Sequence, residues 1–472
     1  MSNSRIVLFL SVLFCLLSAV TFASEIEGFG LSNKQISLKQ AIKTGLKQNR
    51  QLQKILDSLE LSELDLETAR AEFRTRFSTS VSSDARLGTE LGQTYNVSAR
   101  KKFQYGTNLT VSGNSSTFGD STLSEISAQI SQPLMKGRGK LANTMSLVEA
   151  EWNNEKRLLL KEMAETELIY NIIVAYHQAI RQQKNIEVHD KNLERVRKLV
   201  AAAQAKLKVG MVSKMDVLRA EIQASQAEDS LKDAENNLDQ AADTLRQLLG
   251  MGFDEAIGII PQLECETRNL DLDLLREKAL ATRRDKKILE RDVELSRRRL
   301  KIAEESQSPP VDLTLQVSQI GQGVGFSDSM ELDETRVGIG LAASTDFFTS
   351  LGKTGYRKAW LAYKGKKNEL EQKKVVIINE VRDAYRRVSR GSDRISLREK
   401  RIADAGKQVE YAMRRYEKGL IDNLAVIDAE KELVEAKTDH ISAVIDYIIA
   451  IGQLDKATDQ LRDKWLNTEQ GD

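Results

Sequence analysis

A stretch of eighteen residues occurs twice in this chain, and the copy limits the possible folds more than any other feature. Lys206–Gln223 (KLKVGMVSKMDVLRAEIQ) and Arg415–Glu432 (RYEKGLIDNLAVIDAEKE) align without a gap when Gly210 is placed on Gly419. Eight further positions then carry matching residues. Because a repeat usually corresponds to one supersecondary unit, the sequence predicts two tandem structural repeats.

Each copy has the features of a turn between two helices. Glycine at the end of a helix readily adopts the left-handed conformation that other residues resist. Ser213 in the first copy, and Asp422 or Asn423 in the second, can cap the helix that follows. We therefore expect one helix to arrive at each copy, turn at the glycine and leave as a second helix.

The segments on both sides of each turn carry an apolar residue every seven positions. Such a repeat keeps one seam facing a partner helix and favours a left-handed supercoil. The sequence thus predicts two long antiparallel coiled-coil hairpins, for which a plain spacer is the simplest interpretation. The seam residues are Ile172, Ala179, Ile186, Leu193, Val200 and Leu207, then Val217, Ala224, Leu231, Leu238 and Leu245, and in the second half Val381, Val388, Ile395, Ile402, Val409 and Tyr416, then Val426, Leu433, His440, Tyr447, Leu454 and Leu461.

Helical periodicity predicts the remaining boundaries of the two repeats. The expected organisation is a signal peptide at 1–23, a first repeat at 24–249, a linker at 250–268, a second repeat at 269–466 and a tail at 467–472. The expected helices are Leu38–Arg76, Leu141–Lys208, Ser213–Leu249, Leu270–Gln307, Thr354–Lys418 and a last one ending near Trp465.

Between its helices each repeat contains segments in which apolar and polar residues alternate, the period of two that is typical of strands. In the first repeat, alternation at Asn108–Ser112 and Ile126–Ser131 predicts two strands around a loop at Gly113–Leu123. The second repeat has corresponding strands at Val311–Ile320 and Thr335–Thr345 around the loop Gly321–Glu334. About twenty-five extra residues at 88–112 also resemble a strand, and whether they add strands stays open at this point. Four strands per chain are too few to close a membrane barrel, so the chain is expected to associate.

Charge and composition exclude several classes of function. The 70 basic and 69 acidic residues become 69 and 69 when Arg5 is removed with the signal peptide, which argues against a nucleic-acid-binding protein. The three histidines lack a metal-binding spacing, and no nucleophile is paired with a base. We therefore expect no enzyme activity, no cofactor and no metal site.

The order of these elements resembles that of the TolC-like outer-membrane efflux duct family. The resemblance covers nearly the whole chain after the signal peptide. It is carried by LKQAIKTGLKQNRQLQ at 38–53, SQPLMKGRG at 131–139, REKALATRRDKKILERDVELSRRRL at 276–300 and RRYEKGLIDNLAVIDAEKEL at 414–433. It implies a mainly helical fold with a membrane β-barrel, in which three copies share twelve strands in the outer membrane and their long helices form an α-barrel tunnel through the periplasm.

The resemblance also implies roles for residues at the two turns. The docking turns for a periplasmic adaptor would be Val209-Gly210-Met211 and Lys418-Gly419-Leu420. The periplasmic gate would comprise Asp216, Tyr416 and Asp428, with Tyr416 bonded across to the first turn. Asp216 and Asp428 have a second interpretation, because negative charge in the first turn of a helix is favourable in itself.

Together these features predict a passive exit duct of a tripartite efflux or type I secretion system. Its partners would be two further copies of the chain, outer-membrane lipid, a periplasmic adaptor and an inner-membrane pump or ABC transporter. The cargo stays open between drugs, metal ions and proteins. The alternative is a structural or adaptor coiled-coil protein of the envelope without a pore, which would not need amphipathic strands in both repeats.

Overall fold

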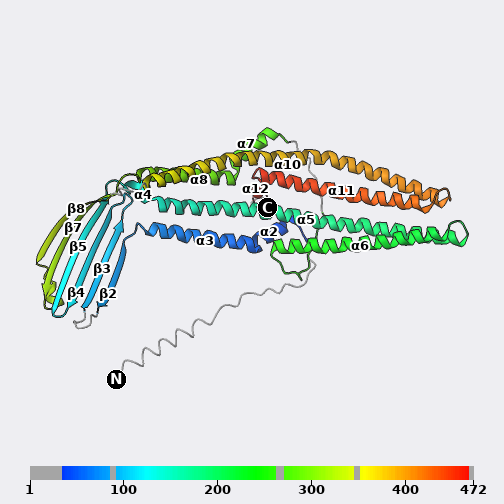
Figure 1. The fold of residues 1–472 in the computed structure, drawn as a ribbon. Coiled ribbons are helices and arrows are strands. Elements are labelled where there is room, and N and C mark those ends of the chain that lie inside the picture. Colours follow the sequence, from blue (N-terminus) through cyan, green and yellow to red (C-terminus); the bar gives the residue numbers. More distant parts are fainter. Residues whose placement is uncertain (1–34, 85–91, 262–269, 345–350, 467–472) are drawn as a thin grey trace, which may run out of the picture.

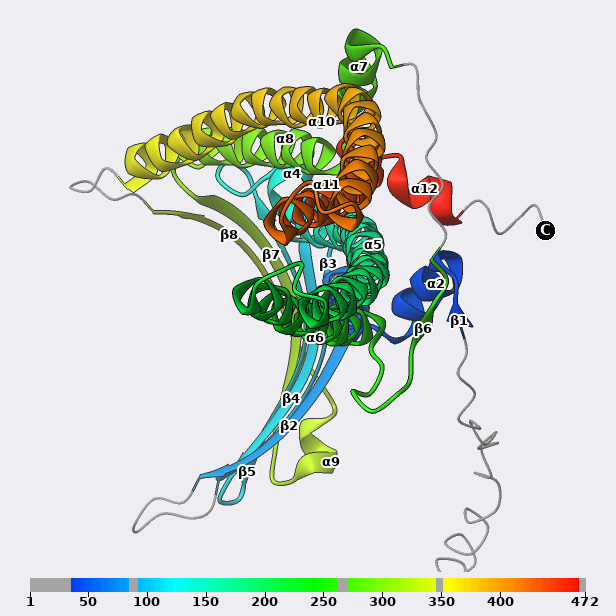
Figure 2. The same cartoon turned by 90° about the vertical axis from the view of Figure 1, so that its right-hand side faces the viewer.

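The chain is long and narrow, with a sheet at one end and two helical hairpins that reach the other (Figure 1). The computed structural model describes residues 35–84, 92–261, 270–344 and 351–466. The predicted signal peptide, the predicted tail and part of the predicted linker lie outside these described residues. In the view along the long axis, the two hairpins lie side by side and the sheet is strongly curved (Figure 2).

Helices make up most of the described chain, and the longest two lead to the repeated turns. Those two are α5 with 64 residues and α10 with 67. The first half contains α2 (Leu38–Gln48), α3 (Arg50–Ala71), α4 (Gly139–Asn143), α5 (Met145–Lys208) and α6 (Lys214–Leu249). The second half contains α7 (Leu272–Thr282), α8 (Arg284–Glu305), α9 (Phe326–Ser329), α10 (Leu351–Glu417), α11 (Asn423–Ala457) and α12 (Leu461–Leu466).

Several helices that were predicted as continuous are in fact broken. The helix predicted at Leu38–Arg76 is interrupted at Asn49, whose extended backbone (φ −64°, ψ 120°) cannot continue α2. The Asn49 side chain instead accepts hydrogen bonds of 3.0 Å from the amides of Gln51 and Leu52 at the start of α3. Arg283 separates α7 from α8 with a similar backbone (φ −53°, ψ 120°). Asn49 thus caps α3 and overrides an apolar periodicity that runs through the break. At Arg283 the extended backbone alone makes the break, because its side chain does not cap α8.

Two smaller breaks also correct the predicted helices. Thr144 separates α4 from α5 in the segment expected as one helix from Leu141. The last helix was expected to reach Trp465, but α11 ends at Ala457 and α12 starts only at Leu461. Between them Asp459 has a φ of 58°, a left-handed conformation that a helix does not contain.

The predicted seams hold the two hairpins together. Antiparallel α5 packs on α6, and α10 packs on α11 (Figure 1). The seam residues at the heart of these contacts are almost fully buried, which confirms the coiled-coil prediction. They include Ile172, Ala179, Leu193, Val217, Leu245, Val381, Val388, Val409, Tyr416, Val426, Leu433, Tyr447 and Leu454. The last predicted seam residue, Leu461, lies instead on α12 and packs against α5.

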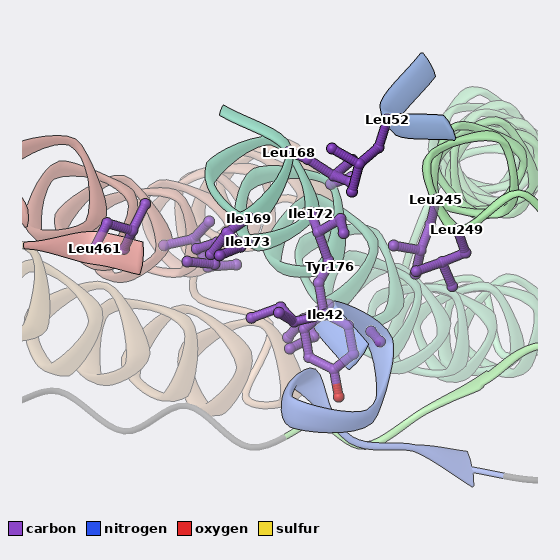
Figure 3. Close-up of a cluster of buried hydrophobic side chains, with 14 residues drawn as sticks. Ile42, Leu52, Leu168, Ile169, Ile172, Ile173, Tyr176, Leu245, Leu249 and Leu461 are labelled. Atoms are coloured by element: carbon purple, nitrogen blue, oxygen red, sulfur yellow. The ribbon is translucent and has the colours of Figure 1, made fainter. Parts of the chain in front are cut away.

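The largest buried cluster joins the start of the described chain to the middle of α5. Apolar side chains of α2, α3, α6 and α12 meet those of α5 there, as Figure 3 shows for Ile42, Ile172 and Leu245. Tyr176 lies in this cluster, and its hydroxyl donates to the carbonyls of Ile36 (3.0 Å) and Ile260 (3.1 Å). Ile36 belongs to the short strand β1 (Gln35–Ile36), and Ile260 directly follows its parallel partner β6 (Gly258–Ile259), so Tyr176 ties that pair to the bundle.

The sheet has six strands, and this corrects the expectation of four per chain. Their order is β2-β3-β4-β5-β7-β8, and every neighbouring pair is antiparallel. The additional hairpin is formed by β2 and β3, so of the predicted extra residues 88–112 only β3 and the start of β4 form strands, and β2 lies before them. The strands are β2 (Arg76–Asp84), β3 (Gly92–Lys102), β4 (Asn108–Phe118), β5 (Ser121–Pro133), β7 (Val311–Gly323) and β8 (Glu334–Ala343).

The loop predicted at Gly113–Leu123 is wrong, because both flanking strands continue through it. Only Gly119 and Asp120 connect β4 to β5, and Gly119 has the positive φ (59°) that so tight a turn needs. The serines, threonines and asparagine of this segment suggested a loop, yet they pair across the sheet, as Ser115 does with Ser124.

The second predicted loop, Gly321–Glu334, is shorter and partly helical. β7 extends to Gly323, and α9 then folds back on the sheet. Ser329 of α9 is buried and lies 2.8 Å from the Ser124 hydroxyl of β5. A Cβ at Gly321 would lie only 2.2 Å from the Ser329 carbonyl oxygen, so glycine is needed for α9 to lie this close.

The two faces of the sheet differ sharply in polarity. Residues paired directly across the six strands form rows, and one such row on the first face is Phe77, Ala99, Val111, Ala128, Val317 and Val337. The next row, on the opposite face, is Ser78, Ser98, Ser112, Ser127, Ser318 and Arg336. The large apolar side chains of the first face are exposed on every strand: Phe77, Val81, Tyr95, Val97, Val111, Ile126, Ile130, Leu315, Val317, Val337, Ile339 and Leu341. None of the helices in the described chain is both long and apolar enough to span a membrane.

Candidate functional site at the paired helical turns

The first turn follows α5 and contains the predicted residues Val209, Gly210 and Met211. Gly210 has a φ of 74°, and its amide donates to the Leu207 carbonyl at 3.0 Å. The Met211 amide donates to the Lys206 carbonyl at 2.9 Å. These two bonds satisfy carbonyls at the end of α5, as in the usual glycine termination of a helix.

The second turn repeats this geometry after α10. Gly419 has a φ of 73°, and its amide donates to the Tyr416 carbonyl at 2.9 Å. The Leu420 amide donates to the Arg415 carbonyl, also at 2.9 Å. Of the two candidate caps for α11, the structure selects Asp422, whose carboxylate accepts from the Ala425 amide at 3.4 Å.

Two polar side chains, Lys206 and Asn423, join the two turns. Lys206 of the first turn donates from Nζ to the carbonyl of Tyr416 and, at 3.3 Å, to that of Glu417. In the opposite direction, the Asn423 side chain donates to the Asp216 carbonyl at 2.6 Å. Asn423 is fully buried, so this bond is shielded from water. The paired turns therefore form one unit, which we call the tip.

Tyr416 lies at the centre of the tip. Its side chain is 1% exposed and packs against Leu199 of α5 and Val426 of α11. The Lys206 ammonium lies 4.1 Å from the centre of the Tyr416 ring, within the range of a cation–π contact. Burial raises the pKa of the Tyr416 phenol, and the nearby Asp216 charge raises it further.

The contact of Tyr416 with the first turn differs from the expected one. The resemblance implies that Tyr416 bonds across the tip, yet its hydroxyl has no hydrogen-bond partner among the described residues. The bond instead uses the Tyr416 carbonyl and ring, and Lys206 supplies the other partner. Sequence reasoning missed this role of Lys206, because a lysine at a helix end usually remains in solvent.

Asp216 caps the helix that starts at the first turn. Its carboxylate accepts from the Ser213 amide at 2.9 Å and from the Ser213 hydroxyl at 2.7 Å, while its own amide donates to that hydroxyl. These bonds from Ser213 lower the pKa of Asp216, with a smaller contribution from Arg219 at 3.6 Å. The capping interpretation is therefore realised, and the gate role of Asp216 stays a prediction.

Asp428 differs from Asp216 in having an exposed side chain. It lies on α11, two turns after Gly419, and makes no hydrogen bond or ion pair with any residue that the structure describes. Its capping interpretation is not realised, since Asp422 supplies the cap. The Asp428 charge is thus available to whatever approaches this face of the tip.

Apolar side chains are exposed at the tip. Val209 is 70% exposed, Met211 74% and Leu420 63%. Met215, Leu218 and Leu424 extend the same apolar area along the first turns of α6 and α11. Exposed apolar groups of this size commonly mark an interaction surface. Gly210 and Gly419 lie between them, with nothing within 4 Å of a Cβ built on either.

A buried ion pair connects the two hairpins behind the tip. Arg195 of α5 lies 2.7 Å from Glu430 of α11, whose side chain is 3% exposed. The repeat matches Glu430 with Glu221, but the one hydrogen bond that Glu221 accepts within the described chain comes from Gln204 of its own hairpin, at 3.1 Å. The match between Glu221 and Glu430 was the one sequence signal that pointed to this ion pair. Their different partners show that the two hairpins are not equivalent.

A comparison of the sequence with known proteins identifies its relatives. The sequence profile of the family described as Outer membrane efflux protein matches residues 41–251 and 275–459. Outer membrane protein TolC of Escherichia coli (strain K12) is 21% identical over 294 residues, which are 60% of this chain and 59% of that protein. Outer membrane protein TolC of Salmonella enteritidis is 21% identical over 291 residues, with the same two shares. The matched region thus spans about 59% of these relatives.

Solved channel structures share the fold. The outer membrane protein VceC of Vibrio cholerae has a TM-score of 0.70 at 17% identity, over 89% of this chain and 95% of VceC. The outer membrane channel CmeC of Campylobacter jejuni has a TM-score of 0.69 at 14% identity, over 96% of this chain and 94% of CmeC.

Proposed function

The chain belongs to the outer membrane efflux protein family, and on that premise we propose that it is the exit duct of a tripartite efflux or type I secretion system. The family is one of channels and not a class of enzymes. In this proposal three copies form one pore. Their sheets close a barrel in the outer membrane, and their hairpins form a tunnel through the periplasm.

The observation that carries the proposal is the exposed apolar face of the sheet. Twelve large apolar side chains from all six strands are exposed on that face, while the other face is mostly polar and has only Phe118 and Leu123 as exposed large apolar side chains among the described strands. A barrel wall in lipid needs this pattern, with an apolar outside and a polar lumen. The unpaired edges of β2 and β8 support the trimer, because an open edge cannot face lipid.

The tip is the proposed contact with the rest of the export system. Val209, Met211 and Leu420 present apolar surface at the end farthest from the sheet, where a periplasmic adaptor would dock. Lys418 adds an exposed positive charge beside them. The adaptor would in turn connect the duct to an inner-membrane pump or ABC transporter, which supplies the energy and selects the cargo.

The gate is proposed at the same end of the molecule. Under threefold symmetry Asp428 would form a ring of three exposed carboxylates, which attracts cations. Lys206, Tyr416, Asn423 and Asp216 would hold the two hairpins of each copy together and so keep the pore narrow. Opening would require the hairpins to separate at these contacts.

The rival function is a structural or adaptor coiled-coil protein without a pore. It accounts for the long hairpins, but it gives no reason for a sheet with an exposed apolar face. Fractionation of cell envelopes separates the two. We expect the protein in the outer-membrane fraction, extracted by detergent as a trimer that conducts ions in planar bilayers. A monomer released by a salt wash, without conductance, would reject the duct.

A further inference from the structure

The additional hairpin β2–β3 is an integral part of the sheet. β2 pairs with β3 over nine residues, and β3 pairs with β4 over eleven, without a bulge in either register. Cross-strand hydroxyl pairs continue the polar face into the hairpin, as between Ser78 and Ser98 at 2.7 Å. The apolar face continues as well, through Phe77 and Val81 of β2 and Val97 of β3.

The hairpin is also anchored where the sheet meets the helices. Lys102 at the end of β3 forms an ion pair of 2.6 Å with Glu72 at the end of α3, and Glu72 accepts from Ser146 of α5 at 3.0 Å. In the turn from β3 to β4, the Tyr105 carbonyl accepts from the Gly139 amide at 3.2 Å. Contacts with α3, α4 and α5 thus fix the end of β3 that lies next to the helices, in line with the ends of the other strands.

Both outer edges of this six-stranded sheet lack a partner in the described chain. Every residue of β2 and of β8 is exposed. Six strands are fewer than the eight of the smallest membrane barrels, so one copy does not close on itself. The two edge strands have nine and ten residues, and both present an apolar face on the same side of the sheet.

We propose that β2 of one copy pairs antiparallel with β8 of the next, so that three copies close a barrel of eighteen strands in place of the twelve expected from four strands per chain. This inference rests on the proposed function as a trimeric duct. The occupant of each edge is a second copy of this chain, because only the opposite edge supplies a matching strand length and polarity.

The register of this pairing follows from which residues of β2 and β8 lie at the same end of the sheet. Phe77 follows α3 closely, and Ala343 lies shortly before α10, so both lie at the helical end of the sheet. Pairing Phe77 with Ala343 of the neighbour aligns Val81 with Ile339 and brings apolar residues to the same face throughout. In this register eight residues of each strand overlap, from Phe77–Asp84 against 336–343.

The geometry of a closed barrel supports this register. One pass across the sheet, following paired residues, leads from Phe77 to Val337, which lies six residues before Ala343. Across the six strands of one copy the register therefore shifts by six residues, which is a shear of one residue per strand. Eight-stranded barrels with a shear of eight have the same ratio and a strand tilt of about 36°. That tilt lies within the range of about 35–45° for membrane barrels.

The added strands would widen the duct at its outer end. Barrel diameter increases roughly linearly with strand number, so eighteen strands give a lumen about half again as wide as twelve. The tunnel still contains only two long helical hairpins per copy. The mouth in the outer membrane is then wider than in a twelve-stranded duct, while the helical content of the tunnel is unchanged.

Disulfide crosslinking in outer membranes tests the pairing. Cys265 is the single cysteine after the predicted signal peptide, and Cys265→Ser provides the background. With Val81→Cys and Ile339→Cys together, oxidation is expected to convert most of the protein into dimers and trimers that a reductant separates. Each single cysteine variant should stay monomeric on the denaturing gel. Pairs of Val81→Cys with Val337→Cys or Leu341→Cys, two residues off register, should crosslink several-fold less.

The alternative with twelve strands has its own crosslink. In a twelve-stranded barrel β4 would be the edge strand of each copy. With the same shift of one residue per strand, Gly113 would then pair with Ile339 of the neighbouring copy. A Cβ at Gly113 meets nothing within 4 Å, so Gly113→Cys is tolerated. Efficient crosslinking of Gly113→Cys with Ile339→Cys overturns the eighteen-stranded barrel and leaves the duct intact. An outer-membrane trimer with no crosslink from Val81→Cys to β8 also overturns it, whereas absence from the outer membrane rejects the duct itself.

Discussion

Lys206 and Tyr416, 210 positions apart in the sequence, are in contact at the tip, where the lysine ammonium lies 4.1 Å from the tyrosine ring centre. The same ammonium donates to the Tyr416 carbonyl. One side chain of the first hairpin thus holds the last turn of α10 in the second. Only Asn423, which bonds to the Asp216 carbonyl, makes a comparable polar contact at the tip among the described residues.

Removal of the Lys206 side chain should loosen the tip. Lys206→Ala deletes the donor to α10, so we expect a higher single-channel conductance in planar bilayers. Lys208→Ala is the matched control, because Lys208 is exposed two residues later. Tyr416→Phe should change conductance little, since the hydroxyl has no partner in the described chain. A larger effect of Tyr416→Phe than of Lys206→Ala would contradict this assignment.

Neutralisation of Asp428 should reduce the preference of the channel for cations. Asp428→Asn removes one exposed charge per copy, hence three from the proposed ring, at constant side-chain size. Reversal potentials in a salt gradient measure the change. Glu417→Gln removes another exposed carboxylate near the second turn and serves as the control. If both variants shift the reversal potential equally, Asp428 has no special position at the gate.

The glycines of the tip should be needed for adaptor docking. Gly419 has a φ of 73°, so Gly419→Val strains the turn by about 1–2 kcal/mol. We expect weaker crosslinking to the adaptor and an unchanged amount of trimer. Gly406→Ala in α10 is the control, because a Cβ there meets nothing within 4 Å and no left-handed backbone is involved. Undiminished crosslinking in a Gly210→Val, Gly419→Val double variant would exclude the turns as the docking site.

The ion pair behind the tip should be essential for stability. Arg195→Ala leaves Glu430 buried without its partner, a change that costs about 3–5 kcal/mol in comparable buried pairs. Arg197→Ala, which removes an exposed arginine 3.8 Å from Glu228, should cost at most about 1 kcal/mol. Urea unfolding measures both. A second change, Glu430→Gln, should recover part of the stability lost in Arg195→Ala, and no recovery would argue against an unpaired buried charge.

Stability should fall in acid because of Asp285. Burial alone would raise the pKa of this carboxyl, but hydrogen bonds from Arg283 and from Lys373 (2.8 Å) outweigh burial and lower the pKa to about 2. The unfolded chain has an aspartate pKa near 3.9, so it takes up the proton first as the pH falls. The contribution of about 2 kcal/mol is thus present above pH ~4 and is lost between pH ~4 and ~2. Urea unfolding midpoints for wild type and Asp285→Asn should converge over this window.

Local pattern and repetition were enough to predict the helical hairpins. The seam residues recur every seven positions in both halves, and Gly210 and Gly419 end the long helices as expected. These features depend on contacts along one helix or across one turn, which a linear sequence displays directly. The breaks at Asn49 and Arg283 were missed because the apolar period continues through them.

The sequence by itself determined the two repeats, the left-handed turns and the presence of amphipathic strands, since each follows from backbone sterics or from a fixed period. The tertiary structure alone decided the number of strands and the partners at the tip. Small polar residues in β4 and β5 resemble a loop until they pair across the sheet, as Thr117 does with Thr122 at 3.2 Å. In the same way, Lys206 and Arg195 resemble ordinary surface charges until folding brings the second hairpin beside the first.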